Sequence, residues 1–106
     1  MVTTVPVATL VARLADGAFV LDVREPGEYL AGHVPGAVLA PMSHFTSSLD
    51  PVPGDRVVHV ICQSGNRSRS MADLLVRLGY DAVSVDGGTA AWVAAGRPVV
   101  RGPLAA

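Results

Sequence analysis

Residues 57–68 read Val-Val-His-Val-Ile-Cys-Gln-Ser-Gly-Asn-Arg-Ser, an apolar run followed at once by a polar one. The apolar part has the character of a buried strand, and a helical pattern of leucines follows the polar part. Cys62, the only cysteine in the chain, therefore stands where a strand ends and a loop leads into a helix. The N–H groups of such a loop and helix N-terminus favour a thiolate and can hold an anionic substrate. This position makes Cys62 a candidate nucleophile.

The loop after Cys62 consists of polar residues and one glycine, namely Gln63, Ser64, Gly65, Asn66, Arg67 and Ser68. A lone cysteine behind an apolar run is more commonly a small, inert core residue. Apolar packing does not require this series of polar side chains, whereas an anion-binding loop requires hydrogen-bond donors. Gly65 also permits a positive φ angle, which turns successive N–H groups inward. The loop therefore favours a functional Cys62, with residues 63–68 as candidate substrate-binding residues.

Length and composition indicate one globular domain over residues 1–106, since 50% of the residues are apolar and only 16% are charged. The formal net charge is -1 without runs of like charge, which argues against binding to nucleic acid or to a membrane surface. No apolar stretch is long enough to cross a bilayer, and the N-terminus lacks the pattern of a secretory signal. We expect a soluble, cytoplasmic protein, and a monomer because most apolar residues fall in core patterns.

Several chemistries are excluded by residue type. All 8 basic residues are arginine, so no lysine is available for a Schiff base. One cysteine excludes an intramolecular disulfide and a CxxC pair, so a reactive Cys62 needs an external thiol to resolve it. His44 and His59 do not have the spacing of metal ligands with each other or with Cys62. We predict neither a metal nor a cofactor.

Apolar runs alternate with helical periodicity along the chain. Strands are predicted at residues 18–23, 37–40, 57–61 and 82–85. Helices are predicted at residues 7–14, 26–30, 71–78 and 88–95, with a further short one at 43–49 inside an irregular stretch over 41–56. Ser68 or Ser70 is expected to cap the third helix. Continuously apolar strands between helices are typical of a parallel sheet covered on both faces.

Reactive groups in such a sheet gather at the carboxyl ends of its strands. Asp22–Glu25, the loop after Cys62 and Asp86–Gly88 each follow a predicted strand. We expect all three segments to lie at one edge of the sheet.

The chain resembles a single-domain rhodanese, from about Val5 to Pro98. The resemblance rests on four segments in a fixed order, namely Leu21–Tyr29 (Leu-Asp-Val-Arg-Glu-Pro-Gly-Glu-Tyr), Gly32–Ala37 (Gly-His-Val-Pro-Gly-Ala), Cys62–Ser68, and Asp86–Gly88 together with Trp92. It implies an α/β fold of three layers, α/β/α, around a five-stranded, mainly parallel sheet.

The resemblance also implies sulfur transfer, with Cys62 at the position of the catalytic cysteine. In that family the thiolate takes the outer sulfur of thiosulfate, or of a persulfide donor, and sulfite leaves thiosulfate. Cyanide or a thiol then accepts the sulfur, and a thioredoxin-like or other protein thiol is a further candidate acceptor. The backbone amides of Gln63–Arg67 match the part that surrounds the sulfur.

Arg67 offers a fork of N–H donors suited to an oxyanion such as thiosulfate, so we predict that it binds substrate. The alternative is a salt bridge with a helix neighbour. Asp22 and Arg24 are interpreted as a structural pair that braces the edge of the site. His33 is expected to anchor its loop by hydrogen bonds, and Trp92 to lie in the core.

Two other functions are alternatives to a sulfurtransferase that uses thiosulfate. Related dual-specificity phosphatases and arsenate reductases carry a Cys-x5-Arg loop, whereas the spacing from Cys62 to Arg67 is Cys-x4-Arg. The shorter loop suits a sulfur atom better than a tetrahedral phosphate, so these activities are disfavoured. The other alternative is a persulfide carrier or interaction module that a partner protein loads.

Overall fold

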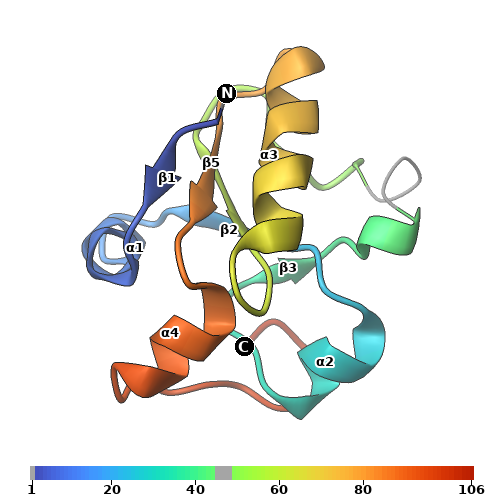
Figure 1. Cartoon of the computed structure of the whole chain (residues 1–106). Coiled ribbons are helices and arrows are strands. Elements are labelled where there is room, and N and C mark those ends of the chain that lie inside the picture. Colours follow the sequence, from blue (N-terminus) through green and yellow to red (C-terminus); the bar gives the residue numbers. More distant parts are fainter. Residues whose placement is uncertain (1, 45–48) are drawn as a thin grey trace.

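The computed structural model describes residues 2–44 and 49–106. In this part of the chain five strands form one sheet in the order β1-β5-β4-β2-β3, and all four ladders are parallel (Figure 1). The strands are β1 (Thr4–Val5), β2 (Phe19–Asp22), β3 (Val38–Leu39), β4 (Val58–Ile61) and β5 (Ala82–Val85). The helices are α1 (Val7–Leu14), α2 (Pro26–Ala31), α3 (Asn66–Arg77) and α4 (Gly88–Ala94). The predicted three-layer α/β fold is confirmed.

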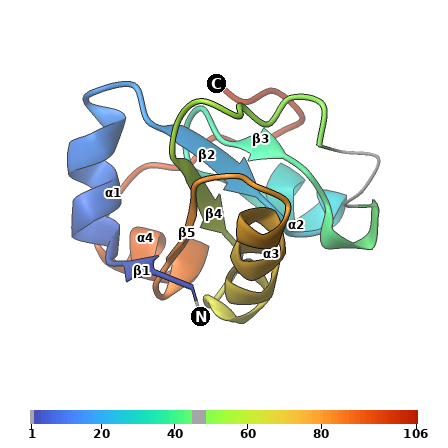
Figure 2. The same ribbon diagram turned by 90° about the horizontal axis from the view of Figure 1, so that it is seen from above.

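Helices cover both faces of the sheet, and Figure 2 shows α3 on the side opposite to α1 and α4. Side chains alternate between the two faces along each strand. Val58 and Val60 of β4 therefore pack toward Leu75 of α3, in one buried cluster. Ile61 of the same strand packs in a second cluster with Leu10 of α1, and Trp92 of α4 lies in that cluster as predicted. Fully burying one such aliphatic side chain stabilises the fold by about 1.5–3 kcal/mol, which explains why short strands suffice.

The four predicted strands and the helices predicted at residues 7–14, 26–30, 71–78 and 88–95 are present, but the start of α3 differs from the prediction. This helix begins at Asn66, and its N-cap is Gly65 with a φ of 104° and no side-chain cap. The prediction that Ser68 or Ser70 caps the helix is therefore wrong. The first turn of α3 was not predicted from the sequence, because residues 66–70 are polar and only the later leucines show helical periodicity.

Two further details differ from the sequence-based expectation. The short strand β1 was not predicted, because its two residues carry no periodic signal. Of the short helix expected at residues 43–49, the structure shows a single 3-10 turn over 42–44, and residues 45–48 lie outside the described part.

The C-terminal segment follows the connection between α2 and β3. Val100 exchanges backbone hydrogen bonds with His33, each of 2.9 Å, and the Gly102 N–H donates to the Leu30 carbonyl. The His33 ring anchors this connection as predicted, since Nδ1 lies 2.8 Å from the carbonyl oxygen of Tyr29 and Nε2 lies 2.9 Å from that of Leu104. Within the described residues, no helix has both the length and the apolar character that a membrane span requires.

Candidate active site

The carboxyl ends of β2, β4 and β5 meet at one edge of the sheet, as predicted. Cys62 directly follows β4, and Arg24 lies two residues after β2. Gly88 begins α4 just beyond β5. The three segments are joined by hydrogen bonds, which fix the loop after Cys62 from both sides.

Cys62 is a free, buried cysteine with 1% of its surface exposed. The backbone N–H of Gly65 donates to Sγ over 3.1 Å, and Ser68 Oγ lies 3.4 Å from Sγ. Because Gly65 has a positive φ, its N–H turns inward to the sulfur, the geometry expected for an anion-binding loop. The sulfur therefore lies inside a ring of donors.

This ring determines the protonation of Cys62. Burial by itself raises the pKa of the thiol, because the charged form loses its hydration. Hydrogen bonds from the Ser68 side chain and from the N–H groups of Ser68, Gly65 and Ser64 outweigh burial and lower the pKa below that of an ordinary cysteine. The thiolate is the nucleophilic form of cysteine, and these hydrogen bonds favour that form without a separate base.

Ser84 of β5 supports this arrangement from the sheet. Its hydroxyl lies 2.7 Å from that of Ser68, and both residues are buried. Ser68 Oγ also lies 3.1 Å from the Gly65 carbonyl oxygen, to which it donates when Cys62 is a thiol. A hydroxyl carries a single proton, so Ser68 donates to the thiolate when that proton turns from the Gly65 carbonyl to Sγ, and Ser84 can then donate to Ser68 Oγ. Ser84 was not predicted as a site residue. The available signal was a serine within an apolar, buried strand, where a polar side chain needs a partner.

The first turn of α4 holds the backbone of Cys62 and Gln63. The Thr89 N–H and Oγ1 both donate to the carbonyl oxygen of Cys62, at 2.8 and 3.0 Å, and the Ala90 N–H donates to that of Gln63. This close approach requires glycine at position 88, because a Cβ there would lie 2.5 Å from the Cys62 carbonyl oxygen.

Arg67 is bound to Glu28 of α2. Its Nη1 and Nη2 donate to the two carboxylate oxygens of Glu28 over 2.7 and 2.8 Å. The hydrogen bond from Arg67 lowers the pKa of Glu28 to about 2, so the carboxylate is charged at neutral pH. Glu28 also accepts the Glu25 N–H in the capping box that begins α2, which fixes its position. The guanidinium of Arg67 is thus bound to the carboxylate of Glu28 through both Nη atoms.

The sequence model of the rhodanese-like domain matches residues 7–95 of this chain. The chain belongs to the rhodanese-like family. A sulfurtransferase of Allochromatium vinosum is 37% identical to this rhodanese domain over 103 residues, which cover 94% of this chain and 96% of that protein.

Solved structures agree with this assignment. The crystal structure of a rhodanese-related protein from Thermoplasma volcanium matches with a TM-score of 0.86 and 34% identity, over 92% of this chain and 97% of that chain. The reduced Bacillus anthracis protein CoADR-RHD matches with a TM-score of 0.86 and 32% identity, over 93% of this chain and 18% of that chain.

The residues predicted for the site of this rhodanese domain fall into two groups. Gly65, Ser68 and the N–H of Ser64 contribute hydrogen bonds to Cys62 Sγ. The other predicted side chains point to other partners: Gln63 to Arg24, Asn66 to Arg69, and Arg67 to Glu28. A direct contact between Arg67 and a substrate therefore remains a prediction.

Asp22 and Arg24 form the predicted structural pair. Nε and Nη2 of Arg24 donate to the Asp22 carboxylate at 2.9–3.2 Å, and both residues are buried. Arg24 also donates from Nη1 to Gln63 Oε1 over 3.1 Å and from Nη2 to the Gly32 carbonyl over 2.8 Å. The pair therefore connects β2 to the loop after Cys62. Among residues 2–44 and 49–106, no group of three His, Cys, Asp or Glu side chains is placed to hold a metal ion.

Proposed function

We propose that this rhodanese domain is a sulfurtransferase that carries a sulfane sulfur as a persulfide on Cys62. The observation behind the proposal is the buried cysteine whose pKa is lowered by the hydrogen bonds of Ser68, Gly65 and Ser64. The relative named sulfurtransferase, 37% identical along nearly the full length of both chains, supports the same reaction class.

The first half-reaction uses thiosulfate as donor. The Cys62 thiolate attacks the outer sulfur, a bond forms between Sγ and that sulfur, and the bond to the sulfite group breaks with its electron pair. Sulfite leaves, and the terminal persulfide sulfur carries the negative charge. Donors fixed around the site, such as the N–H groups of the loop, stabilise this charge without reorganising.

In the second half-reaction an acceptor attacks the terminal sulfur. With cyanide, a carbon–sulfur bond forms, the bond between Sγ and the terminal sulfur breaks, and its electron pair returns to Sγ. The products are thiocyanate and the Cys62 thiolate, ready for another donor. A thiol, including a protein thiol of the thioredoxin type, accepts the sulfur in the same way.

One observation favours a second candidate, a carrier that receives its sulfur from a persulfide rather than from thiosulfate. The guanidinium of Arg67 is engaged at both Nη atoms by Glu28, so a thiosulfate oxyanion has to compete for it. A persulfide donor needs no such contact. Phosphatase or arsenate reductase activity is not proposed, because the loop is one residue shorter than Cys-x5-Arg.

Steady-state kinetics test the proposal. Thiocyanate release is measured with thiosulfate and cyanide, and with an organic persulfide in place of thiosulfate, for the wild type and for Cys62→Ser. We expect release above the uncatalysed rate from at least one donor and none above that rate from Cys62→Ser, because an alcohol forms no persulfide. Equal rates for the two proteins would remove Cys62 from the reaction. A half-saturating thiosulfate concentration far above that of the persulfide would favour the carrier.

A further inference from the structure

Ser84 is a buried hydroxyl in an otherwise apolar strand, β5. Only 1% of its surface is exposed, and its neighbours Val83 and Val85 face the opposite side of the sheet. Ala82 lies on the same face as Ser84 and packs in the buried cluster that contains Cys62. Apolar packing does not require a hydroxyl at this position, so its proton needs another explanation.

The proton of Ser84 has one acceptor. Ser84 Oγ lies 2.7 Å from Ser68 Oγ, and no other side chain or carbonyl of residues 2–44 and 49–106 hydrogen-bonds to it. If Ser68 donated to Ser84, the Ser84 proton would be buried without a partner, which costs the free energy of an unmade hydrogen bond. Ser84 therefore donates to Ser68 Oγ, and the Ser68 proton points elsewhere.

The Ser68 proton has two acceptors within reach, the Gly65 carbonyl oxygen at 3.1 Å and Cys62 Sγ at 3.4 Å. The same carbonyl also accepts from the Arg69 N–H over 3.4 Å and from Arg69 Nε over 3.2 Å. A carbonyl oxygen has two lone pairs, so Arg69 alone can satisfy it. The Ser68 proton can thus turn to the sulfur without leaving a buried acceptor unpaired.

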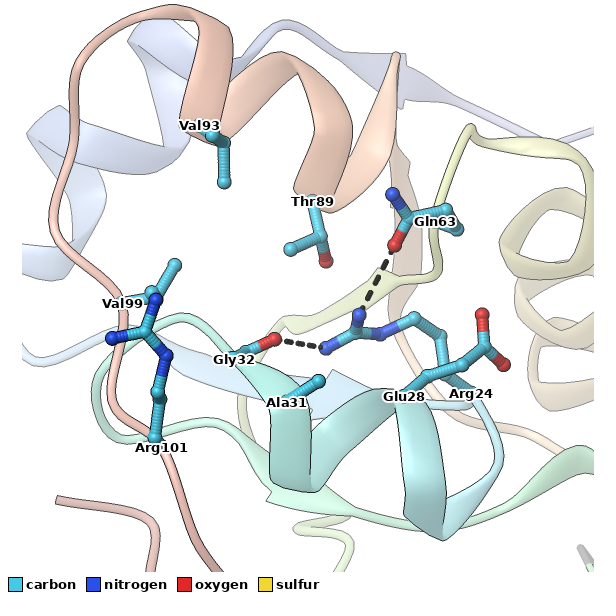
Figure 3. Close-up of a pocket in the computed structure, with 9 residues that line it drawn as sticks. All are labelled: Arg24, Glu28, Ala31, Gly32, Gln63, Thr89, Val93, Val99 and Arg101. Atoms are coloured by element: carbon cyan, nitrogen blue, oxygen red, sulfur yellow. Dashed lines mark hydrogen bonds between the residues drawn. The ribbon is translucent and has the colours of Figure 1, made fainter.

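The other polar side chains of the loop are engaged elsewhere. Gln63 lines a cavity between α2 and α4, and its Oε1 accepts from Arg24 Nη1, as a dashed line in Figure 3 shows. The side chains of Asn66 and Arg67 are bound to partners other than the sulfur. Among the side chains of residues 63–68, that of Ser68 is therefore the one that hydrogen-bonds to the sulfur, and Ser84 is the group that orients it.

We propose that Ser84 is a positioning residue of the sulfur transfer, which directs the Ser68 proton to Cys62 Sγ when Sγ is charged. The proposal rests on the proposed function and adds a residue to it. Sγ carries the charge in the thiolate, whereas in the persulfide the charge lies on the terminal sulfur. The Ser68 proton therefore turns to the Gly65 carbonyl when sulfur is loaded and back to Sγ on discharge. Ser84 donates to Ser68 Oγ in both states.

This hydrogen bond acts differently on the two half-reactions. During discharge the acceptor attacks the terminal sulfur, the bond from that sulfur to Sγ breaks, and its electron pair returns to Sγ. The Ser68 hydrogen bond lowers the pKa of Cys62, which makes Sγ a better leaving group in this step. The same lowered pKa makes Sγ a weaker nucleophile toward the donor. Where Cys62 is fully ionised, we therefore expect Ser84 to accelerate discharge but not loading.

Titration of the thiol tests the hydrogen bond without sulfur transfer. The thiolate fraction is followed by ultraviolet absorbance against pH, relative to Cys62→Ser, in the wild type, Ser84→Ala and Ser84→Thr. We expect Ser84→Ala to raise the pKa of Cys62, so that about threefold less thiolate is present below that pKa, the range of one coupling within a hydrogen-bond network. Ser84→Thr keeps the hydroxyl and should restore the wild-type titration.

The control for this titration is Ala82→Gly, which loosens the same face of β5 without removing a hydroxyl. It should lower Tm and leave the pKa of Cys62 unchanged. An unchanged pKa in Ser84→Ala, or an equal rise in Ala82→Gly, would overturn the proposal.

Single-turnover kinetics test the effect on sulfur transfer. Loading by thiosulfate or an organic persulfide and discharge by cyanide are measured separately, at a pH above the pKa of Cys62. We expect Ser84→Ala to slow discharge about twofold and not to slow loading. Equal slowing of both steps would contradict the proposal. If Cys62 takes up no sulfur while Ser84→Ala still raises its pKa, the proposed function fails and the role of Ser84 toward the thiolate stands.

Discussion

At the scale of single residues, the chemistry of this rhodanese domain depends on which donors reach Cys62 Sγ. Ser68 contributes a hydroxyl that Ser84 in turn supports. Hydrogen bonds to a charged group are worth about 1.5–3 kcal/mol, more than those between neutral groups. The loss of a single donor should therefore be visible in the reactivity of the thiol.

Ser68→Ala is expected to raise the pKa of Cys62, because the thiolate loses the side-chain hydrogen bond that lowers it. At neutral pH a smaller fraction of the thiol is then ionised, and the rate of alkylation by iodoacetamide should fall about tenfold. The whole pH–rate profile moves to higher pH. Ser70→Ala, an exposed serine on the same helix, is the control and should leave the profile unchanged. An unchanged profile in Ser68→Ala would show that the backbone donors alone hold the thiolate.

Glu28→Gln tests whether Arg67 is available to an oxyanion. The substitution replaces the carboxylate that holds both Nη atoms of Arg67, so thiosulfate should bind with less competition. We expect the half-saturating concentration of thiosulfate to fall about threefold, the range of an exposed ion pair, with little change in the maximal rate. Asp73→Asn, which breaks the exposed pair with Arg77 on α3, is the control. A rise in place of a fall would mean that Glu28 positions Arg67 for substrate.

At the scale of elements, α4 approaches the loop after Cys62 so closely that no Cβ fits at position 88. Gly88→Ala would place a Cβ 2.5 Å from the Cys62 carbonyl oxygen, at a φ of 59° that side chains rarely adopt. We expect it to destabilise the domain by about 2 kcal/mol or more and to lower Tm by about 10 °C. Gly27→Ala in α2 is the control, because no atom lies within 4 Å of the added Cβ. This substitution should stabilise the domain slightly. Equal melting temperatures for both variants would contradict the tight contact.

Some helices and strands could be predicted from the sequence, whereas the contacts between them could not. Helical periodicity was sufficient for α1, and the apolar run with its terminal cysteine was sufficient for β4. The ion pair of Glu28 with Arg67 joins residues 39 positions apart, and the pair of Ser68 with Ser84 joins residues 16 apart. These pairs form because α2, α3 and β5 lie next to one another in the folded chain. A single sequence carries no periodic signal for which elements become neighbours. The position of the loop after Cys62 at the sheet edge was thus predictable, but Ser84 and the partner of Arg67 were not.

At the scale of the whole molecule, buried His59 connects β4 to neighbouring elements far from the site. Its Nδ1 donates to the Phe19 carbonyl over 3.0 Å, and Nε2 accepts from Arg13 Nη1 over 3.1 Å. This arrangement uses the neutral ring. Burial is the main cause that lowers the pKa of His59, because an imidazolium there loses its hydration.

The pH dependence of stability follows from this lowered pKa. The contribution of His59 is fully present above the unfolded-state pKa of about 6.5 and is lost as the pH falls below it. We expect the free energy of unfolding, measured in urea, to be smaller at pH 5 than at pH 7.5. His59→Gln should reduce this difference, whereas His44→Gln, an exposed histidine, should not. A pH dependence that is the same in both variants would assign it to other groups.

Intact-protein mass spectrometry of the wild type tests the central claim, a persulfide on Cys62, most directly. The protein is incubated with thiosulfate or with an organic persulfide, and cyanide is then added. We predict a gain of one sulfur atom with at least one donor, absent in Cys62→Ser, and its removal by cyanide with release of thiocyanate. A folded protein with a free thiol that gains no sulfur from either donor would contradict the claim.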